Sequence, residues 1–192
     1  VINLVADIGG TNLRIGISED DGEISALSVY QCSDYAGLAE IVADYISVNE
    51  LNNVVINACF AIACPVEQDL IVMTNLPWQF SKLALQKALN LHTLLFINDY
   101  TAIAHAVPFL SEDQKVKIGG GEVQFKKPIS ICGPGTGLGV ANVIPNNNGW
   151  ISLGGEGGHV DFAPTNNLET QILQFLLTRY EHVSYEQLLS GL

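Results

Sequence analysis

The chain has 192 residues, of which 48% are hydrophobic and 15% are charged, and its formal net charge is −12. This composition is typical of a globular protein with ample apolar material for a core, and it excludes a disordered chain. Only eight residues are Lys or Arg, which argues against nucleic acids and anionic membranes as partners. With so few cations, any bound phosphate would have to be held by backbone N–H groups and a metal ion.

Export from the cell and membrane insertion are both unexpected. No apolar run approaches the roughly 20 residues that span a bilayer. Residues 1–6 are apolar but lack a basic region and a cleavage site, which argues against a signal peptide and favours a cytoplasmic location. The four cysteines, Cys32, Cys59, Cys64 and Cys132, are therefore expected as reduced thiols, and no pair has the CxxC spacing of a zinc or redox motif.

The first part of the chain predicts three strands, over residues 1–8, 13–18 and 24–30. Turns at residues 9–12 and at the acidic residues 19–22 separate them. A helix follows, because Leu38, Ile41, Val42 and Tyr45 recur at helical spacing. Ser33 or Asp34 is available as its N-cap.

Strands and helices then alternate. Residues 54–63 and 94–97 predict strands, the first of them covered on both faces, and residues 71–74 predict a short strand. Ser81 is expected to cap a helix that runs to Leu89. A further helix begins near Asp99 and is expected to bury Ala102, Ile103, Ala106 and Val107. This order indicates an α/β domain with a mixed sheet.

A domain boundary is expected in the polar, glycine-containing segment 108–127, which gives domains over residues 1–109 and 110–192. The second domain opens with a strand over residues 128–132, a turn over 133–139 and a returning strand over 140–144. A helix over residues 168–180 and a short one from Ser184 complete the chain.

Two glycine-rich turns are candidates for phosphate binding. Residues 7–12, with sequence DIGGTN, end a buried strand with a carboxylate, and residues 133–139 read GPGTGLG. Glycines let successive backbone N–H groups approach an anion closely. The chain continues as a strand after each turn and has no Gly-Lys-Ser/Thr ending, so Rossmann and Walker sites are excluded. A plain hairpin, with Asn12 at positive φ, remains the alternative for the first turn.

Other polar residues have both a functional and a structural interpretation. Asn98 and Asp99 lie where a strand ends and a helix begins, the edge where α/β proteins bind ligands, yet both residue types are also preferred helix caps. Glu156 and His159 lie in a frame of four glycines that disfavours a helical metal pair. Glu186 fits a capping box or an exposed helix face. Trp78, near Asn75, is more often core than a sugar platform.

Taken in order, six segments resemble the bacterial glucokinase family, within the superfamily of sugar kinases, Hsp70 and actin. They are residues 7–12, 61–66, 73–78, 97–102, 133–139 and 154–162. The resemblance covers essentially the whole chain. It implies an actin-like ATPase (ribonuclease H-like) α/β fold, with a complete or nearly complete small domain and an incomplete large domain.

The resemblance also implies an activity, the transfer of the ATP γ-phosphoryl group to the 6-hydroxyl of glucose at the entry to glycolysis. It makes Asp99 the catalytic base, and it assigns the sugar hydroxyls to Asn75, Asn98, Asp99, Glu156, His159 and Glu186. It assigns the phosphates to Asp7, Gly9, Gly10, Thr11, Asn12, Gly133, Gly135, Thr136 and Gly137. Mg²⁺ is implied as a cofactor, organised indirectly by Asp7, and the full-length protein is implied to be a homodimer.

Two departures from the family pattern qualify these expectations. The CxCGxxGC zinc motif of the related repressor and kinase group is absent, which places the chain outside that group. Family members also continue past Leu192 through an adenosine-binding turn, so we expect an N-terminal fragment that is inactive in isolation and exposes apolar surface. A kinase for another hexose and a non-catalytic sugar-binding module are the alternatives.

Overall fold

The computed structural model describes residues 1–19, 22–147 and 149–191. The chain forms two compact units, Val1–Ala102 and Ile103–Leu192. The division falls inside helix α3 (Asp99–Ala106), ahead of the boundary expected after residue 109. Within the described ranges, no helix is both long enough and apolar enough to cross a membrane.

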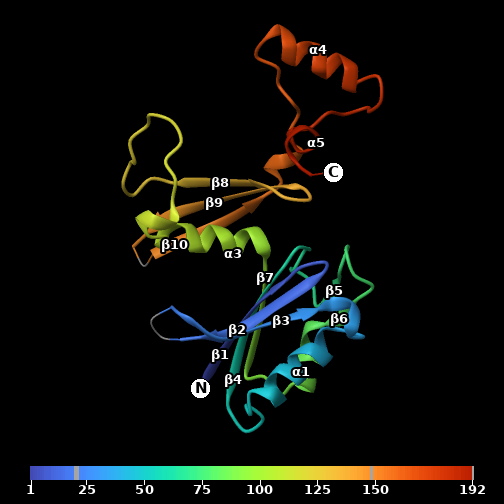
Figure 1. The fold of residues 1–192 in the computed structure, drawn as a ribbon, viewed down its shortest axis with the longest axis vertical. Helices are drawn as coiled ribbons and strands as arrows, with labels where there is room; N and C mark the ends of the chain where they lie inside the picture. Colours follow the sequence, from blue (N-terminus) through green and yellow to red (C-terminus); the bar gives the residue numbers. More distant parts are fainter. Residues whose placement is uncertain (20–21, 148, 192) are drawn as a thin grey trace. The chain divides into compact units, whose positions relative to one another are not determined.

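The first unit is built on a five-stranded mixed sheet with strand order β3-β2-β1-β4-β7 (Figure 1). Strands β1 (Ile2–Ile8), β2 (Asn12–Ser18) and β3 (Ile24–Gln31) are antiparallel neighbours. Strands β4 (Ile56–Ile62) and β7 (Thr93–Asn98) continue the sheet parallel to β1. The mixed sheet predicted from the sequence is thus confirmed.

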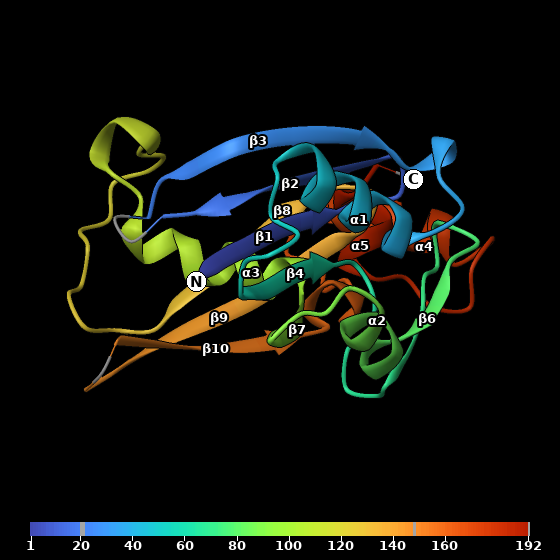
Figure 2. The same ribbon diagram turned by 90° about the horizontal axis from the view of Figure 1, so that it is seen from below.

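The core of this unit lies between the sheet and the helices α1 (Leu38–Val48) and α2 (Lys82–Ala88), which are visible in Figure 2. Period-two alternation along β1 buries Leu4, Ala6 and Ile8 on the covered face. Tyr45 of α1 is fully buried, and its hydroxyl donates to the carbonyl oxygen of Ala26 at 2.9 Å, so the helix is tied to the β3 edge.

Two expectations about helix termini have different outcomes. Ser81 caps α2 as predicted, with its hydroxyl accepting from the Ala84 N–H at 3.1 Å. The expected cap of α1 is wrong. Ser33 and Asp34 lie in a separate 3₁₀ turn, η1 (Cys32–Asp34), and Gly37 occupies the N-cap position without a side-chain hydrogen bond. Glu40 compensates by accepting from the Ala36 N–H at 2.7 Å.

The expected buried face of α3 is also wrong. Ala104 is the fully buried residue of this helix, whereas Ala102 and Val107 are half-buried and Ile103 and Ala106 are exposed. The helix gives way after Ala106 to the 3₁₀ turn η2 (Val107–Phe109), so the predicted stripe is not continued at α-helical spacing. A short hairpin of β5 (Leu70–Val72) and β6 (Gln79–Ser81) includes one strand, β6, that the sequence did not indicate.

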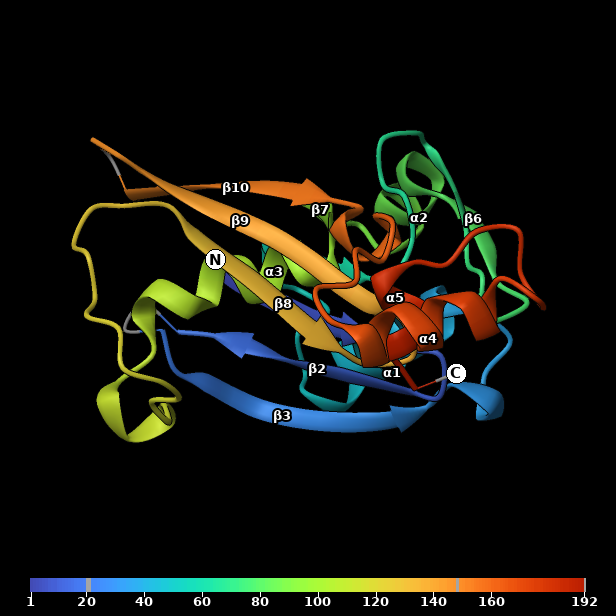
Figure 3. The ribbon, with the colours of Figure 1, turned by 90° about the horizontal axis from the view of Figure 1, so that it is seen from above.

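The second unit contains a three-stranded antiparallel sheet of order β10-β9-β8 (Figure 3). Its strands are β8 (Ile129–Pro134), β9 (Leu138–Asn146) and β10 (Gly149–Gly155), of which β10 was not expected. Helices α4 (Asn167–Leu176) and α5 (Tyr185–Leu189) follow. Helix α4 ends before residue 180, because 3₁₀-type bonds such as Arg179 N–H to the Leu176 carbonyl at 2.9 Å close its last turn.

The segment before β8 contains the 3₁₀ turn η3 (Glu112–Gln114) and exposes large apolar side chains. Val116, Ile118 and Phe125 are 87%, 93% and 87% exposed. The exposed apolar surface expected from the sequence is therefore present here. The acidic turn expected at residues 19–22 is only partly described, because residues 20 and 21 lie outside the described ranges.

Packing of the first core gives a stability prediction. Phe60 is fully buried in β4, and its ring contacts Phe96 edge-to-face at 5.7 Å between centroids. Phe60→Ala should lower the free energy of unfolding by about 3–5 kcal/mol, since it leaves a cavity. Leu83→Ala is the matched control, because Leu83 of α2 is 70% exposed. It should change the free energy of unfolding by less than about 0.5 kcal/mol. Urea unfolding followed by circular dichroism measures both, and equal effects would contradict the assignment of this core.

Candidate functional site

The carboxyl ends of three parallel strands define one edge of the first unit. The pairing register places Ile8 of β1 beside Ile62 of β4, and Ile62 beside Asn98 of β7. The residues that follow, among them Gly9 and Asp99, therefore emerge at one level of the sheet. Since parallel strands lie about 4.8 Å apart, Gly9 and Asp99 are separated by roughly 10 Å, a span that fits a substrate with a phosphate at one end.

The first glycine turn connects β1 to β2 and is exposed. The Gly9 N–H donates to the Asn12 carbonyl at 3.0 Å, and the Cys32 N–H donates to the Thr11 carbonyl at 2.8 Å. The Cys32 thiol also donates to the Gly9 carbonyl at 3.6 Å. These bonds hold the turn from its inner side and leave the backbone of residues 10–12 at the surface.

Glycine is required at position 10 because of space. A Cβ there would lie 2.9 Å from Cβ of Asn75, so the structure packs Asn75 directly against this turn. The expectation that Asn12 tolerates positive φ is wrong, since it is not among the positive-φ residues of the described chain. Trp78, from the same turn as Asn75, is only 5% exposed and belongs to the core, so the structural interpretation of this residue is the correct one.

Asp7 lies at the end of β1 and pairs with Arg14 on the neighbouring strand β2. Their charged atoms are 3.1 Å apart, and each side chain is 56% exposed. In the part of the chain that the structure describes, no cluster of three or more His, Cys, Asp or Glu side chains could hold a metal ion. Asp7 offers a single carboxylate, and Mg²⁺ in nucleotide-binding proteins is usually held by one or two carboxylates together with substrate phosphates.

Asn98 and Asp99 have different structural tasks. Asn98 is the cap of α3, because its Oδ1 accepts from the N–H groups of Tyr100 at 2.9 Å and Thr101 at 3.3 Å. Asp99 is the first residue of the helix and is half-buried, with Oδ1 accepting from the Tyr100 N–H at 2.9 Å. Asn98 thus performs the capping that the sequence allowed for either residue, and Asp99 follows it as the first residue of α3 at the carboxyl end of β7.

The second glycine turn connects β8 to β9 and is shorter than expected. The strands remain paired as far as Pro134 and Leu138, so the turn comprises residues 135–137 and Gly133 lies in a strand. The Gly135 N–H donates to the Gly137 carbonyl at 2.8 Å. Both glycine turns thus join antiparallel strands, which confirms the repeated strand–Gly-Thr–strand layout.

Three predicted residues of the second unit come together beside this turn. His159, in the 3₁₀ turn η4 (Gly157–His159), has Nδ1 at 3.3 Å from Oε2 of Glu156 and Nε2 at 3.2 Å from Oε1 of Glu186. The other oxygen of Glu186 accepts from the Leu138 N–H at 2.8 Å. Glu156, His159, Glu186 and the glycine turn therefore form one connected polar cluster.

Two chain segments, residues 160–162 and 182–185, pair with each other and hold this cluster together. The Phe162 N–H donates to the Val183 carbonyl at 2.8 Å, and the Tyr185 N–H donates to the Val160 carbonyl at 3.2 Å. The rings of Phe162 and Tyr185 pack edge-to-face at 5.5 Å, and His182 pairs with Asp161. Glu186 is positioned by this pairing and by the Ser184–Gln187 capping box of α5. The sequence interpretation of Glu186 as a member of a capping box or of an exposed helix face is wrong, because Gln187 closes the box and the Glu186 side chain is 25% exposed. Pairing between distant loop segments has no periodic signal.

The predicted site residues thus fall into two groups. The first unit carries Asp7, Gly9, Gly10, Thr11, Asn12, Asn75, Asn98 and Asp99, and the second carries Gly133, Gly135, Thr136, Gly137, Glu156, His159 and Glu186.

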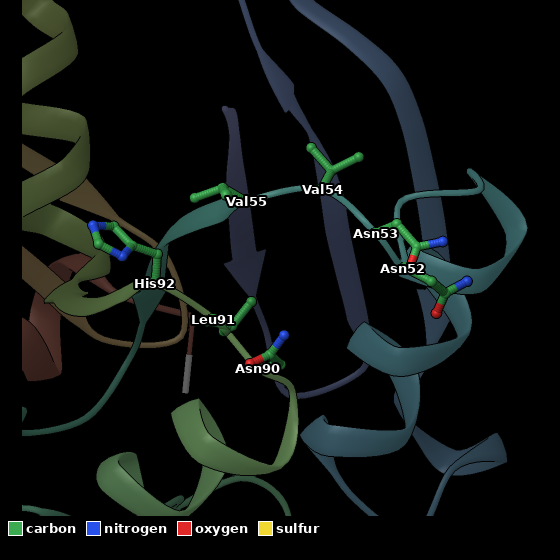
Figure 4. Close-up of a pocket in the computed structure, with 7 residues that line it drawn as sticks. All are labelled: Asn52, Asn53, Val54, Val55, Asn90, Leu91 and His92. Carbon is green, nitrogen blue, oxygen red and sulfur yellow. The ribbon is translucent and has the colours of Figure 1, made fainter.

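A depression in the first unit lies away from these residues (Figure 4). It has a volume of about 580 Å³ and lies at the amino ends of β4 and β7, between residues 52–55 and 90–92. Its labelled polar side chains, which include Asn52, Asn90 and His92, are spread along the rim and do not converge on one point. The edge with Asp99 is the better candidate, because α/β sheets bind ligands at the carboxyl ends of their strands.

The reactivity of the cysteine thiols reports on the packing of the first glycine turn. Burial raises the pKa of the Cys32 and Cys59 thiols, and burial together with the negative charges of Asp99 and Glu67 raises the pKa of Cys64. These groups remain protonated to higher pH than a free thiol and should react slowly at pH 7–8, since the thiolate is the nucleophile. Cys132 is exposed and should react first.

Labelling with a thiol reagent, with sites identified by mass spectrometry, measures this order, and a urea-unfolded sample provides the control in which all four cysteines react. Labelling of Cys32 as rapid as that of Cys132 in the folded protein would show that the first glycine turn is not closed over this thiol.

Comparisons with known proteins agree with this architecture. The glucokinase family model matches residues 4–192. A glucokinase of Colwellia psychrerythraea is 58% identical over 191 residues, which is 100% of this chain and 58% of that protein. The crystal structure of a glucokinase from an Antarctic psychrotroph superimposes with a TM-score of 0.87 at 34% identity, over 99% of this chain and 61% of that one.

A more distant glucokinase, from Balamuthia mandrillaris in complex with glucose, has the same fold, with a TM-score of 0.69 at 22% identity over 99% of this chain and 59% of that chain. The chain therefore spans about three fifths of the length of the relatives that it matches. The match over residues 4–192 and the actin-like ATPase architecture together establish that this chain belongs to the glucokinase family.

Proposed function

We propose that this chain supplies the catalytic base and much of the sugar-binding surface of an enzyme that transfers the γ-phosphoryl group of ATP to the 6-hydroxyl of glucose. The observation that carries the proposal is the row of strand ends that places Asp99 at the same edge as the first glycine turn, with Asn98 performing the capping. A pure binding module has no need for a carboxylate at that place.

Asp99 is proposed to hold the glucose 6-hydroxyl and to take its proton as the new O–P bond forms and the bond to the departing ADP breaks. The transition state of phosphoryl transfer is loose, so positioning and charge stabilisation matter more than early removal of the proton. Asp99 suits this modest task, because it is half-buried at the first turn of α3, directly after the carboxyl end of β7.

The sugar hydroxyls are proposed to bind Asn75, Asn98, Glu156, His159 and Glu186. Glu156, His159 and Glu186 already lie together, with a carboxylate on either side of an imidazole at 3.3 and 3.2 Å. Such an alternation of acceptors and donors suits adjacent sugar hydroxyls, each of which both donates and accepts. A related glucokinase of the same fold binds glucose, which supports this sugar class.

The phosphates are proposed to bind the two glycine turns, through residues 9–12 and 135–137. The chain has eight Lys and Arg residues among 192, so backbone N–H groups are the available donors. Mg²⁺ would supply charge neutralisation on ATP, and Asp7 would orient its water ligands. The Arg14 guanidinium, 3.1 Å from Asp7, holds that carboxylate in place.

The proposal also covers the domains of the protein, its oligomeric state and its location in the cell. Residues 1–109 are assigned to a small domain and residues 110–192 to the first part of a large domain. The resemblance supports a homodimer for the full-length protein and a cytoplasmic location.

Asp99→Asn in the full-length protein tests the base. Asparagine keeps the size and hydrogen bonds of the residue but cannot accept the proton, so turnover should fall at least about 100-fold. The affinity for glucose should remain within about threefold of wild type, because a neutral partner retains most of one hydrogen bond. A coupled assay and calorimetry measure the two quantities. Asp113→Asn, an exposed acid of η3, is the control and should keep wild-type turnover; wild-type turnover in Asp99→Asn would exclude the base.

The isolated 192-residue chain should bind ATP poorly and turn over slowly or not at all. It spans 58% of its Colwellia relative, and the adenosine-binding turn implied by the family lies in the remainder. A coupled assay with the isolated and full-length proteins at equal concentration measures this. Equal glucose phosphorylation by both proteins would contradict the proposal that the adenosine-binding part lies outside these 192 residues. If the full-length protein phosphorylates another hexose faster than glucose, that hexose is the substrate.

A further inference from the structure

The carboxylate of Glu186 makes contacts on two sides. Its Oε1 lies 3.2 Å from Nε2 of His159, within the cluster proposed to bind sugar. Its Oε2 accepts from the backbone N–H of Leu138 at 2.8 Å, at the end of the second glycine turn. One side chain therefore touches both the sugar cluster and the turn proposed to bind phosphate.

The Glu186 carboxylate lies directly against the second glycine turn. A Cβ at Gly137 would lie only 2.6 Å from Oε2 of Glu186, so the turn and the carboxylate are in direct contact. The Glu186 side chain is 25% exposed, which limits competition from water for the Leu138 N–H. The end of the same chain segment adds a second tie, since the Gly191 N–H donates to the Gly135 carbonyl at 2.8 Å.

We propose that Glu186 is also the positioning residue of the second glycine turn, and that through it sugar binding and phosphate binding strengthen each other. A sugar hydroxyl that bonds to Oε1 fixes the carboxylate at one end, and Oε2 then holds the Leu138 N–H and the turn in one arrangement. The ordering of this flexible side chain is completed by the first substrate, so the second binds to a turn already in place. This inference rests on the proposed function for the roles of the two sites.

Coupling between two binding sites is reciprocal, so it can be measured through the affinity for glucose alone. If the turn and the sugar share Glu186, a change in the turn must alter the affinity for glucose even when no nucleotide is present. Gly137→Ala is that change, because its methyl group would displace Oε2. Gly121→Ala is the matched control, since a Cβ there meets no atom within 4 Å and the residue lies outside both proposed sites. Neither position has positive φ, so backbone strain does not differ between them.

In the full-length protein without nucleotide, Gly137→Ala should weaken glucose binding about tenfold, as expected for a coupling of ordinary size, and Gly121→Ala should leave it within about twofold. Calorimetric titration with glucose measures both, and circular dichroism verifies that each variant is folded. An unchanged affinity in folded Gly137→Ala, or equal losses in both variants, would overturn the coupling.

A second measurement on the wild-type protein does not depend on the folding of any variant. Addition of glucose alone should shift the backbone amide resonance of Leu138 in ¹⁵N-labelled protein, while that of Gly149, beyond the far end of β9, should stay in place. An unmoved Leu138 resonance at saturating glucose would overturn the coupling.

His159→Ala separates this inference from the proposed function. If His159→Ala leaves the glucose affinity unchanged, the proposed sugar site is wrong. If it weakens glucose binding while Gly137→Ala does not, the sugar site stands and only the coupling through Glu186 fails.

Discussion

The parallel pairing of β1, β4 and β7 is the constraint on which the first unit depends. Because Ile8, Ile62 and Asn98 occupy one row, the glycine turn after β1 and the acid after β7 emerge at one edge, about two strand spacings apart. The apolar side chains of these strands pack against α1 and α2 in one core. A one-residue slip of β7 would move Asp99 off this edge and turn Phe96 out of the core.

The second unit reaches a comparable arrangement by different means. Its antiparallel hairpin has no such row of strand ends, and the polar cluster beside the turn depends on two loop segments that pair through Val160 and Tyr185. Glu186 lies where these constraints meet, against both His159 and the Leu138 N–H. A Cβ at position 137 would lie 2.6 Å from Oε2, so a larger residue there would require the carboxylate to move.

Much of this could be predicted from the sequence. Apolar periodicity indicated most strands and helices, and the capping signals at Ser81 and Ser184 were correct, because both depend on neighbouring residues. Strand β10, the N-cap of α1 and the buried face of α3 were missed, since tertiary packing and 3₁₀ turns decide them. Of the site, the motifs and their candidate residues could be read from the chain. The contact of Asn75 with Gly10 and that of Glu186 with the second turn could not, because each joins residues distant in sequence.

A crystal structure of the full-length protein with bound glucose tests the central claim most directly. The 6-hydroxyl oxygen is expected within hydrogen-bond distance of the Asp99 carboxylate, and other hydroxyls within hydrogen-bond distance of Glu186 and His159. Glucose in the depression between residues 52–55 and 90–92, or in any position that leaves Asp99 without a sugar hydroxyl, would contradict the account.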